Sequence, residues 1–137
     1  AVAEMGPSAK KAVKPLIRAL RDPEMLVRDA AAQALARIGP VAQRAVRHLS
    51  VATNDPEKRV GITAHYALAA ITLKVTERLP IFIRALSDPD SGVRGNACIA
   101  LGGIGPEAKK ASPALIRALR DRDRWVRYYA AVALGNI

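Results

Sequence analysis

Residues 6–38 read GPSAKKAVKPLIRALRDPEMLVRDAAAQALARI, and three near-copies of this stretch follow without a gap. The copies occupy residues 39–71, 72–104 and 105–137, so the period is 33 residues. A fixed period of this size is typical of one supersecondary unit that is stacked on itself. We therefore predict a single repeat domain over residues 1–137. Residues 1–5 align with the end of a copy, and we expect them to be the tail of a preceding repeat in a longer array.

Each copy has the pattern of two helices joined by a turn. In the first copy Val13, Leu16 and Leu20 are spaced three or four apart, which places them on one face of a helix. A proline stands near the start of three of these first helices, so the segment before it, such as residues 7–13, is expected to be a separate turn or a kinked lead-in. The second helix follows Asp22-Pro23 or its counterpart. Aspartate is a common N-cap and proline a common first helical residue, so this pair predicts the helix start.

The second helices can be compared column by column because the copies align without gaps. Five columns barely change, and at about 100° per residue they fall within one arc of roughly 100°. We predict that this arc is the core. Its columns are Val27/Val60/Val93/Val126, Ala31/Ala64/Ala97/Ala130, Ala34/Ala67/Ala100/Ala133, Leu35/Leu68/Leu101/Leu134 and Ile38/Ile71/Ile104/Ile137.

A second arc of the same helices changes its chemistry from copy to copy. Such a face is either plain surface or a binding surface, and four of the five aromatic residues of the chain lie on it. Tyrosine and tryptophan are enriched among the residues that dominate protein interfaces. The alternative is that the three aromatic residues of the last copy only cover that copy. The partner-binding residues expected on this arc are Arg59, Tyr66, Asn96, Ile99, Trp125, Tyr128, Tyr129 and Val132.

Two stretches carry a resemblance to a known family. They are VRDAAAQALARIG (27–39) and LIRALRDRDRWVRYYAAVALGNI (115–137), and the chain resembles the HEAT-repeat family, in particular its short variant named for the phycobilisome (PBS) lyases. The resemblance implies an all-α, right-handed α-solenoid of four 33-residue helix-turn-helix repeats, with the second helices on the concave side. It also implies a ladder between repeats, formed by Asp22, Asp88 and Asp121 with Arg28, Arg94 and Arg127. Gly61 replaces the ladder arginine in the second repeat, which we expect to be the most loosely packed and the least stable.

Nothing in the sequence has the pattern of a catalytic site. His48 and His65 lack further ligands at metal-binding spacing. Cys98 has no activating histidine or lysine and shares its column with small residues, so we expect a buried thiol. We predict a chain that is not an enzyme and that carries no metal or cofactor. The single cysteine favours a reducing compartment, the cytoplasm, and no apolar run is long enough for a membrane span.

The net charge of +10 makes an anionic partner worth considering. Much of the positive charge lies on the first helices, for example at Lys14 and Arg18. We predict a non-catalytic scaffold that binds another protein through its second helices. The alternatives are a nucleic-acid-binding HEAT-like module of the DNA-repair type and a chromophore-binding domain of the bilin-lyase type. Apolar residues at the ends of the array also predict self-association through exposed repeat ends.

Overall fold

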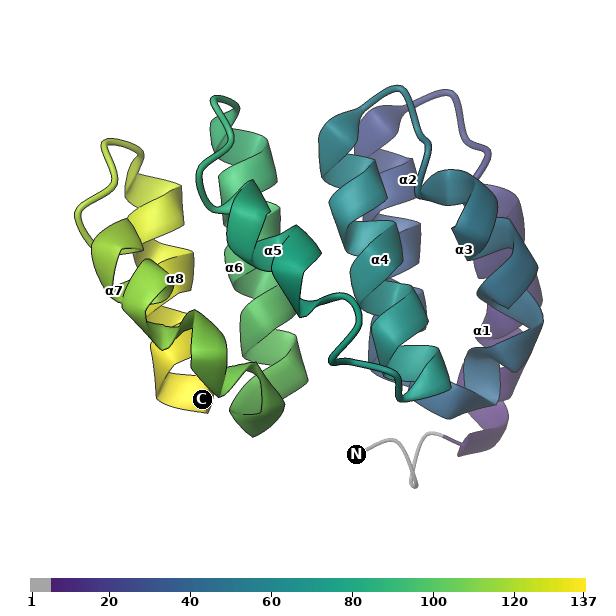
Figure 1. Cartoon of the computed structure of the whole chain (residues 1–137). Helices are drawn as coiled ribbons and strands as arrows, with labels where there is room; N and C mark the ends of the chain where they lie inside the picture. The colour runs from purple at the N-terminus through teal and green to yellow at the C-terminus, as the bar shows by residue number, and fades with distance from the viewer. Residues whose placement is uncertain (1–5) are drawn as a thin grey trace. The chain divides into compact units, whose positions relative to one another are not determined.

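The computed structural model describes residues 6–137, and every regular element in that range is a helix (Figure 1). The second helices of the four repeats are α2 (Met25–Ile38), α4 (Lys58–Thr72), α6 (Ser91–Ile104) and α8 (Arg124–Asn136). Their first residues are 33 positions apart in each case, so the period of the sequence is the period of the helices. The all-α prediction is confirmed. The predicted tail of a preceding repeat, at residues 1–5, lies outside the described residues.

The first helices differ in how the chain enters them. They are α1 (Gly6–Ala19), α3 (Val46–Ala52), α5 (Leu79–Ala85) and α7 (Ser112–Ala118). The predicted lead-in is confirmed before Pro80, where a turn at residues 76–78 precedes α5, and before Pro113, where the 3₁₀ helix η2 (Gly105–Ala111) precedes α7. The second repeat has no proline at this position, yet the 3₁₀ helix η1 (Gly39–Ala45) precedes α3 in the same way. The predicted lead-in is wrong in the first repeat, because α1 runs unbroken through Pro15. Ala9, Val13 and Leu20 stay in helical phase across the proline and are all buried, which offsets the lost hydrogen bond.

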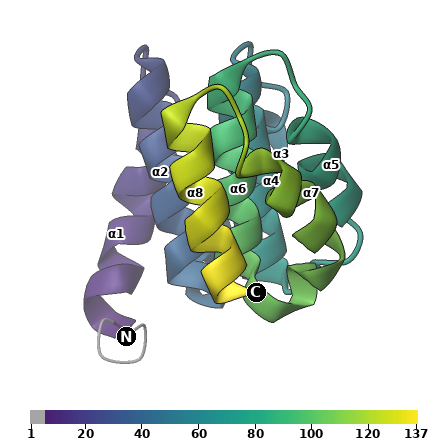
Figure 2. The ribbon, with the colours of Figure 1, turned by 90° about the vertical axis from the view of Figure 1, so that its left-hand side faces the viewer.

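The chain divides into two compact units, Ala1–Lys74 and Val75–Ile137. In the first unit α2 packs against α4, and α1 and α3 pack on them (Figure 1). In the second unit α6 packs against α8, with α5 and α7 on them; Figure 2 shows α8 beside α6. Each unit therefore holds two repeats, built as a layer of second helices against a layer of first helices. The single repeat domain over residues 1–137 stays a prediction beside this division into two units.

Small residues let the second helices approach closely inside each unit. The invariant alanines Ala31, Ala64, Ala97 and Ala130 are at most 3% exposed. A Cβ atom placed on Gly102 of α6 would lie 3.0 Å from the Cα atom of Ala133 in α8. Glycine at this position therefore avoids a tight contact where these two backbones meet.

The Asp-Pro pairs do not cap the second helices, so that part of the sequence prediction is wrong. The helices begin three residues after each aspartate, and the N-cap residues are Glu24, Glu57, Asp90 and Asp123. Each turn aspartate instead accepts a hydrogen bond from the backbone N–H two residues ahead, as Asp22 does from Glu24 at 2.8 Å. Asp121 does the same with Asp123, also at 2.8 Å. This local bond shapes the turn that leads into the helix.

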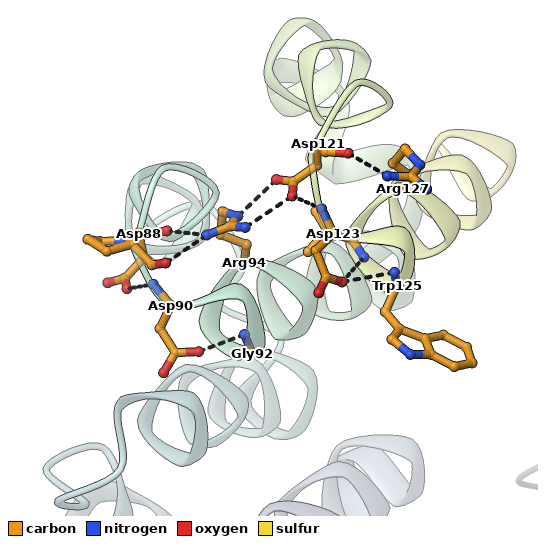
Figure 3. Close-up of polar contacts among 10 residues, drawn as sticks. Asp88, Asp90, Gly92, Arg94, Asp121, Asp123, Trp125 and Arg127 are labelled. Atoms are coloured by element: carbon orange, nitrogen blue, oxygen red, sulfur yellow. Dashed lines mark hydrogen bonds and ion pairs between the residues drawn. The ribbon is translucent and has the colours of Figure 1, made fainter.

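A ladder is present inside both units, and Figure 3 shows its second-unit half. Its membership differs from the expectation, because the acceptor in the first unit is Asp55 and Arg127 donates only to a backbone carbonyl oxygen. Arg28 donates to both carboxylate oxygens of Asp55 at 2.8 and 3.0 Å, and Arg94 does the same to Asp121. Burial alone would raise the pKa of Asp55, but the hydrogen bonds from Arg28 and from the Glu57 amide lower it. The hydrogen bond from Arg94 likewise lowers the pKa of Asp121. Each pair ties two successive repeats together.

Each ladder arginine also holds the turn of its own repeat. Arg94 Nη1 donates to the carbonyl oxygens of Asp88 and Pro89 at 2.8 and 2.9 Å. Arg28 makes the matching pair of bonds in the first repeat. One planar guanidinium therefore connects the turn of one repeat to the aspartate of the next, a task that suits the fork of donors on arginine.

Candidate functional site

The candidate site lies at the start of α8, whose first turn is well fixed. Asp123 is the N-cap, and its Oδ1 accepts hydrogen bonds from the backbone N–H groups of Trp125 at 2.9 Å and Val126 at 3.1 Å. Val126 is buried, whereas the Trp125 side chain points away from the ladder (Figure 3). The cap thus orients a turn that presents an indole ring outward.

Three aromatic rings of α8 contact one another. The centroids of Trp125 and Tyr128 are 6.1 Å apart, and those of Tyr128 and Tyr129 are 5.2 Å apart, both in edge-to-face geometry. Trp125 is 54% exposed and Tyr128 is 56% exposed. The guanidinium carbon of Arg124 lies 5.4 Å from the Trp125 ring centroid, within reach of a cation–π contact. The rings hold each other in place, while Trp125 and Tyr128 keep just over half of their surface in water.

Two further predicted residues lie at the edges of this aromatic cluster. Val132 is 44% exposed and follows Tyr128 by four positions, which places both on one face of α8. Tyr129 is half-buried, and a Cβ atom on Gly95 of α6 would lie 4.0 Å from its ring. Tyr129 therefore links the exposed cluster to the packed pair of helices.

The other predicted residues do not form an exposed face. Arg59 in the first unit and Ile99 in the second are half-buried. Tyr66 and Asn96 are buried at 9% and 6% exposure, which corrects the expectation that they are surface residues. Burial also raises the pKa of the Tyr66 hydroxyl.

The reason for this correction is visible at another position of the variable arc. Thr63 of α4 donates a hydrogen bond of 2.6 Å to Asp29 of α2, and both residues are buried. The two residues differ in chemistry from their counterparts, yet they fill the contact between neighbouring helices. A position whose residue type varies among the repeats is therefore not necessarily exposed to solvent.

Sequence reasoning missed a basic groove in the first unit. It has a volume of about 810 Å³ and is lined by Lys14, Ile17, Arg18, Gln43, Arg44, Val46, Arg47 and His48. These residues come from α1, η1 and α3. The signal available in the sequence was the spacing of the cationic residues, since Lys14 and Arg18 are four apart and Arg44 and Arg47 are three apart.

Cys98 is fully buried in α6, and burial raises the pKa of its thiol to about 12. A thiol in this state is a poor nucleophile at neutral pH. Over residues 6–137, no cluster of three histidine, cysteine or acidic side chains has the arrangement of a metal site. None of the described helices has both the length and the apolarity needed to cross a membrane.

Comparison with known protein families identifies the family to which the repeats belong. The model of HEAT repeats matches residues 1–69 and 79–137. The chain belongs to the HEAT-repeat family. No curated protein matches its sequence. Among solved structures, the crystal structure of an engineered protein is similar, with a TM-score of 0.57 and 25% sequence identity. That match covers 91% of this chain and 62% of the engineered protein, so the chain spans less than two thirds of its length.

Proposed function

We propose that this HEAT-repeat chain is a non-catalytic scaffold that binds another protein through its second helices. Its principal contacts are Trp125, Tyr128, Tyr129 and Val132. The observation that carries the proposal is the cluster of two mainly exposed aromatic rings on a capped, rigid helix. The matching 33-residue spacing of the second helices supports a right-handed α-solenoid of four repeats, and the single thiol supports a reducing compartment such as the cytoplasm.

The physical argument is that these rings supply binding energy at little entropic cost. Trp125 and Tyr128 already contact each other, so a partner that covers them loses little further side-chain freedom. Exposed aromatic residues on a fixed helix are the kind of side chain that dominates interfaces. Arg59 and Ile99 are half-buried and remain candidates for peripheral contacts, whereas Tyr66 and Asn96 act as support within the fold.

The charge around the cluster defines the chemistry of the partner. Arg122, Arg124 and Arg127 are exposed and lie within five residues of Trp125. A partner segment fits this surface if it has an apolar side chain that packs on the rings and neighbouring carboxylates that pair with the arginines. Complementary charge of this kind accelerates association and selects among partners.

We expect the double substitution Trp125→Ala with Tyr128→Ala to weaken binding of such a segment by about 30-fold or more, equivalent to about 2 kcal/mol. The loss follows from removing the two exposed rings. Peptides selected from a random library on the wild-type chain provide the ligand, and calorimetry or anisotropy measures Kd. The thermal midpoint of the double variant is expected to stay within a few degrees of wild type, because both side chains are more than half exposed.

The matched control is Ile116→Ala on α7 with Leu119→Ala at the C-cap of that helix, which removes two exposed apolar side chains elsewhere in the same unit. This control should bind the selected peptides as wild type does. Equal binding by the aromatic double variant and wild type, or a large loss of its stability, contradicts the proposal and returns the rings to a structural role.

The basic groove favours a second candidate function, the binding of nucleic acid or another polyanion. It brings Lys14, Arg18, Arg44 and Arg47 to one surface of the first unit. If these four residues contact phosphates, log K for random duplex DNA should fall with log salt at a slope of about −3.6. Arg44→Glu with Arg47→Glu should abolish that binding, whereas Lys109→Glu with Lys110→Glu removes the same charge and should retain most of it. An equal loss of DNA binding in both variants would show that the net charge of the chain, and not the groove, is responsible for the binding.

A further inference from the structure

The basic groove of the first unit continues into a second, smaller cavity. This small cavity has a volume of about 210 Å³, and it shares Ile17 and His48 with the basic groove. It is also lined by Asp55, which already binds Arg28, and by two exposed polar residues. Its other lining residues are Leu20, Val51, Ala52 and Pro56. Cationic side chains therefore lie at one end of the groove and mainly apolar ones at the other.

The packing of the first helices explains why the groove is open. Helix α1 packs against η1 and α2, and α3 packs against η1 and α4, but α1 and α3 make little contact with each other. The two helices therefore meet at η1 and leave a groove beside it. Both walls belong to consecutive repeats of the first unit, so the groove is complete within residues 14–56.

Four cations of the groove have no acidic partner inside the described residues. Lys14, Arg18, Arg44 and Arg47 are exposed, and none of them forms an ion pair with a carboxylate of residues 6–137. Lys14 and Arg18 are about one helical turn apart on α1, so their charges repel each other. An anionic ligand offsets this repulsion and is attracted by all four charges.

Val51, at the apolar end, is an exception among the repeats. The same position holds an arginine in the other three repeats, at Arg18, Arg84 and Arg117. The Val51 side chain is nevertheless 72% exposed, so the fold itself gains little from a valine here. A ligand that covers Val51 buries this apolar surface. The second repeat thus places an exposed apolar side chain beside the cations where an arginine is otherwise found.

We propose that this groove binds an acidic peptide segment, with its carboxylates beside the four cations and one aliphatic side chain in the small cavity. The inference rests on the second candidate function, because it names the kind of anion that the basic groove takes. The groove volume of about 810 Å³ lies within the range of about 300–1,000 Å³ that is common for ligand sites, whereas about 210 Å³ suits one side chain.

A nucleic acid fits the groove less well. Neither cavity is lined by tryptophan, tyrosine or phenylalanine, the side chains on which the bases of a single strand stack. A phosphate backbone also has no apolar group to fill the small cavity. An acidic segment with one aliphatic side chain matches both ends of the groove.

Labelled peptides that contain four glutamates and one leucine test the inference. One to four glycines separate the leucine from the glutamates, so that the set covers the span between the two cavities. All measurements use the full chain with Trp125→Ala and Tyr128→Ala, because the aromatic cluster of α8 would otherwise compete for the peptides. Fluorescence anisotropy should show that at least one peptide binds with a Kd below about 1 mM.

Charge variants locate the acidic half of this peptide. Arg44→Glu with Arg47→Glu should raise its Kd by about tenfold or more, because two attractive contacts become repulsive. Lys109→Glu with Lys110→Glu makes the same change of charge in the second unit and should leave most of the binding intact. An equal loss in the two double variants overturns the inference.

A double-mutant cycle locates the leucine. Replacing the leucine of the peptide by alanine should raise its Kd by about tenfold, because less apolar area is buried. Val51→Ser should weaken the leucine peptide by about threefold or more and leave the alanine peptide unchanged, since the effect requires both apolar groups. Val41→Ser changes another exposed valine of the first unit, outside both cavities, and should weaken neither peptide.

The outcomes separate this inference from the function on which it rests. The inference is overturned if the leucine and alanine peptides bind equally, or if Val51→Ser weakens both to the same extent. If random duplex DNA binds through Arg44 and Arg47 while no peptide binds, the groove keeps its nucleic-acid candidate function and the peptide inference is wrong. If neither ligand binds, both are wrong.

Discussion

Replacing Arg94 with alanine is expected to lower the free energy of unfolding of residues 75–137 by about 2 kcal/mol. Arg94 is 6% exposed and joins the turn of the third repeat to Asp121 of the fourth through four hydrogen bonds. Its loss removes the donor of two turn carbonyls and leaves the Asp121 carboxylate with only the hydrogen bond from the Asp123 backbone N–H. Because the Asp121 side chain keeps partial contact with water, the expected loss of stability is smaller than for a fully buried unpaired charge.

The rate at which a reagent labels the thiol of Cys98 measures this loss of stability. It is fully buried with a pKa of about 12, so a thiol reagent should label it only when this unit opens. A loss of about 2 kcal/mol corresponds to labelling about 30-fold faster at fixed pH. The measurement belongs at pH 7, because a lowered Asp121 pKa stabilises the fold above the ordinary aspartate pKa, and this contribution is lost as pH falls through the lowered value.

Arg127→Ala is the matched control. Arg127 occupies the same position in α8 but is exposed, and it makes one hydrogen bond, to a carbonyl oxygen. Its removal should change stability by no more than about 0.5 kcal/mol at concentrations where the chain is monomeric. Equal labelling rates in wild type and Arg94→Ala would show that the ladder does not hold the unit together.

Introducing arginine at Gly61 is expected to destabilise the chain by about 2 kcal/mol, although it makes the second repeat match the other three. A Cβ atom at Gly61 would lie 2.9 Å from the backbone carbonyl oxygen of Thr53, closer than side chains tolerate. The end of α3 approaches α4 at this point, and only a residue without a side chain fits. Gly61 is therefore explained by close packing, and the lower stability predicted for this repeat stays a prediction.

Urea unfolding of Gly61→Ala tests whether the close approach of Thr53 alone explains the glycine at this position. Alanine adds only the Cβ atom, so this variant should already be destabilised by about 1 kcal/mol or more, despite its better helix propensity. Gly135→Ala should gain roughly 0.5–1 kcal/mol, because nothing lies within 4 Å of the added atom. Stabilisation by Gly61→Ala would show that the approach of Thr53 is not a constraint.

The sequence was sufficient to predict the repeats, the second-helix core and the aromatic side chains of α8. These features depend on periodicity, and the alanine and valine columns recur where the helices pack. Val27 is the exception in its column, because it is 40% exposed although the sequence predicts it in the core. The helix caps could not be placed in the same way. Aspartate followed by proline forms either an N-cap or a turn that precedes the helix by three residues, and only the backbone geometry distinguishes the two.

Comparison of the repeats also could not separate exposed from buried variable positions. Tyr66 and Asn96 vary in chemistry from repeat to repeat, yet both are buried, as Thr63 is against Asp29. Burial depends on which neighbouring helix covers a position, and this cannot be determined from the residues that occupy one aligned position in the four repeats. The basic groove was missed for a related reason, since its lining comes from three separate elements.

Quenching of tryptophan fluorescence tests the central claim, that the aromatic surface of α8 is available to a partner. Trp125 is the single tryptophan of the chain, so its signal needs no deconvolution. We predict that iodide quenches it efficiently in the free chain, and more strongly than caesium, because Arg124 lies against the ring. A bound partner segment should protect it. Weak quenching in the free chain, or quenching unchanged by a bound segment, would contradict the proposed binding surface.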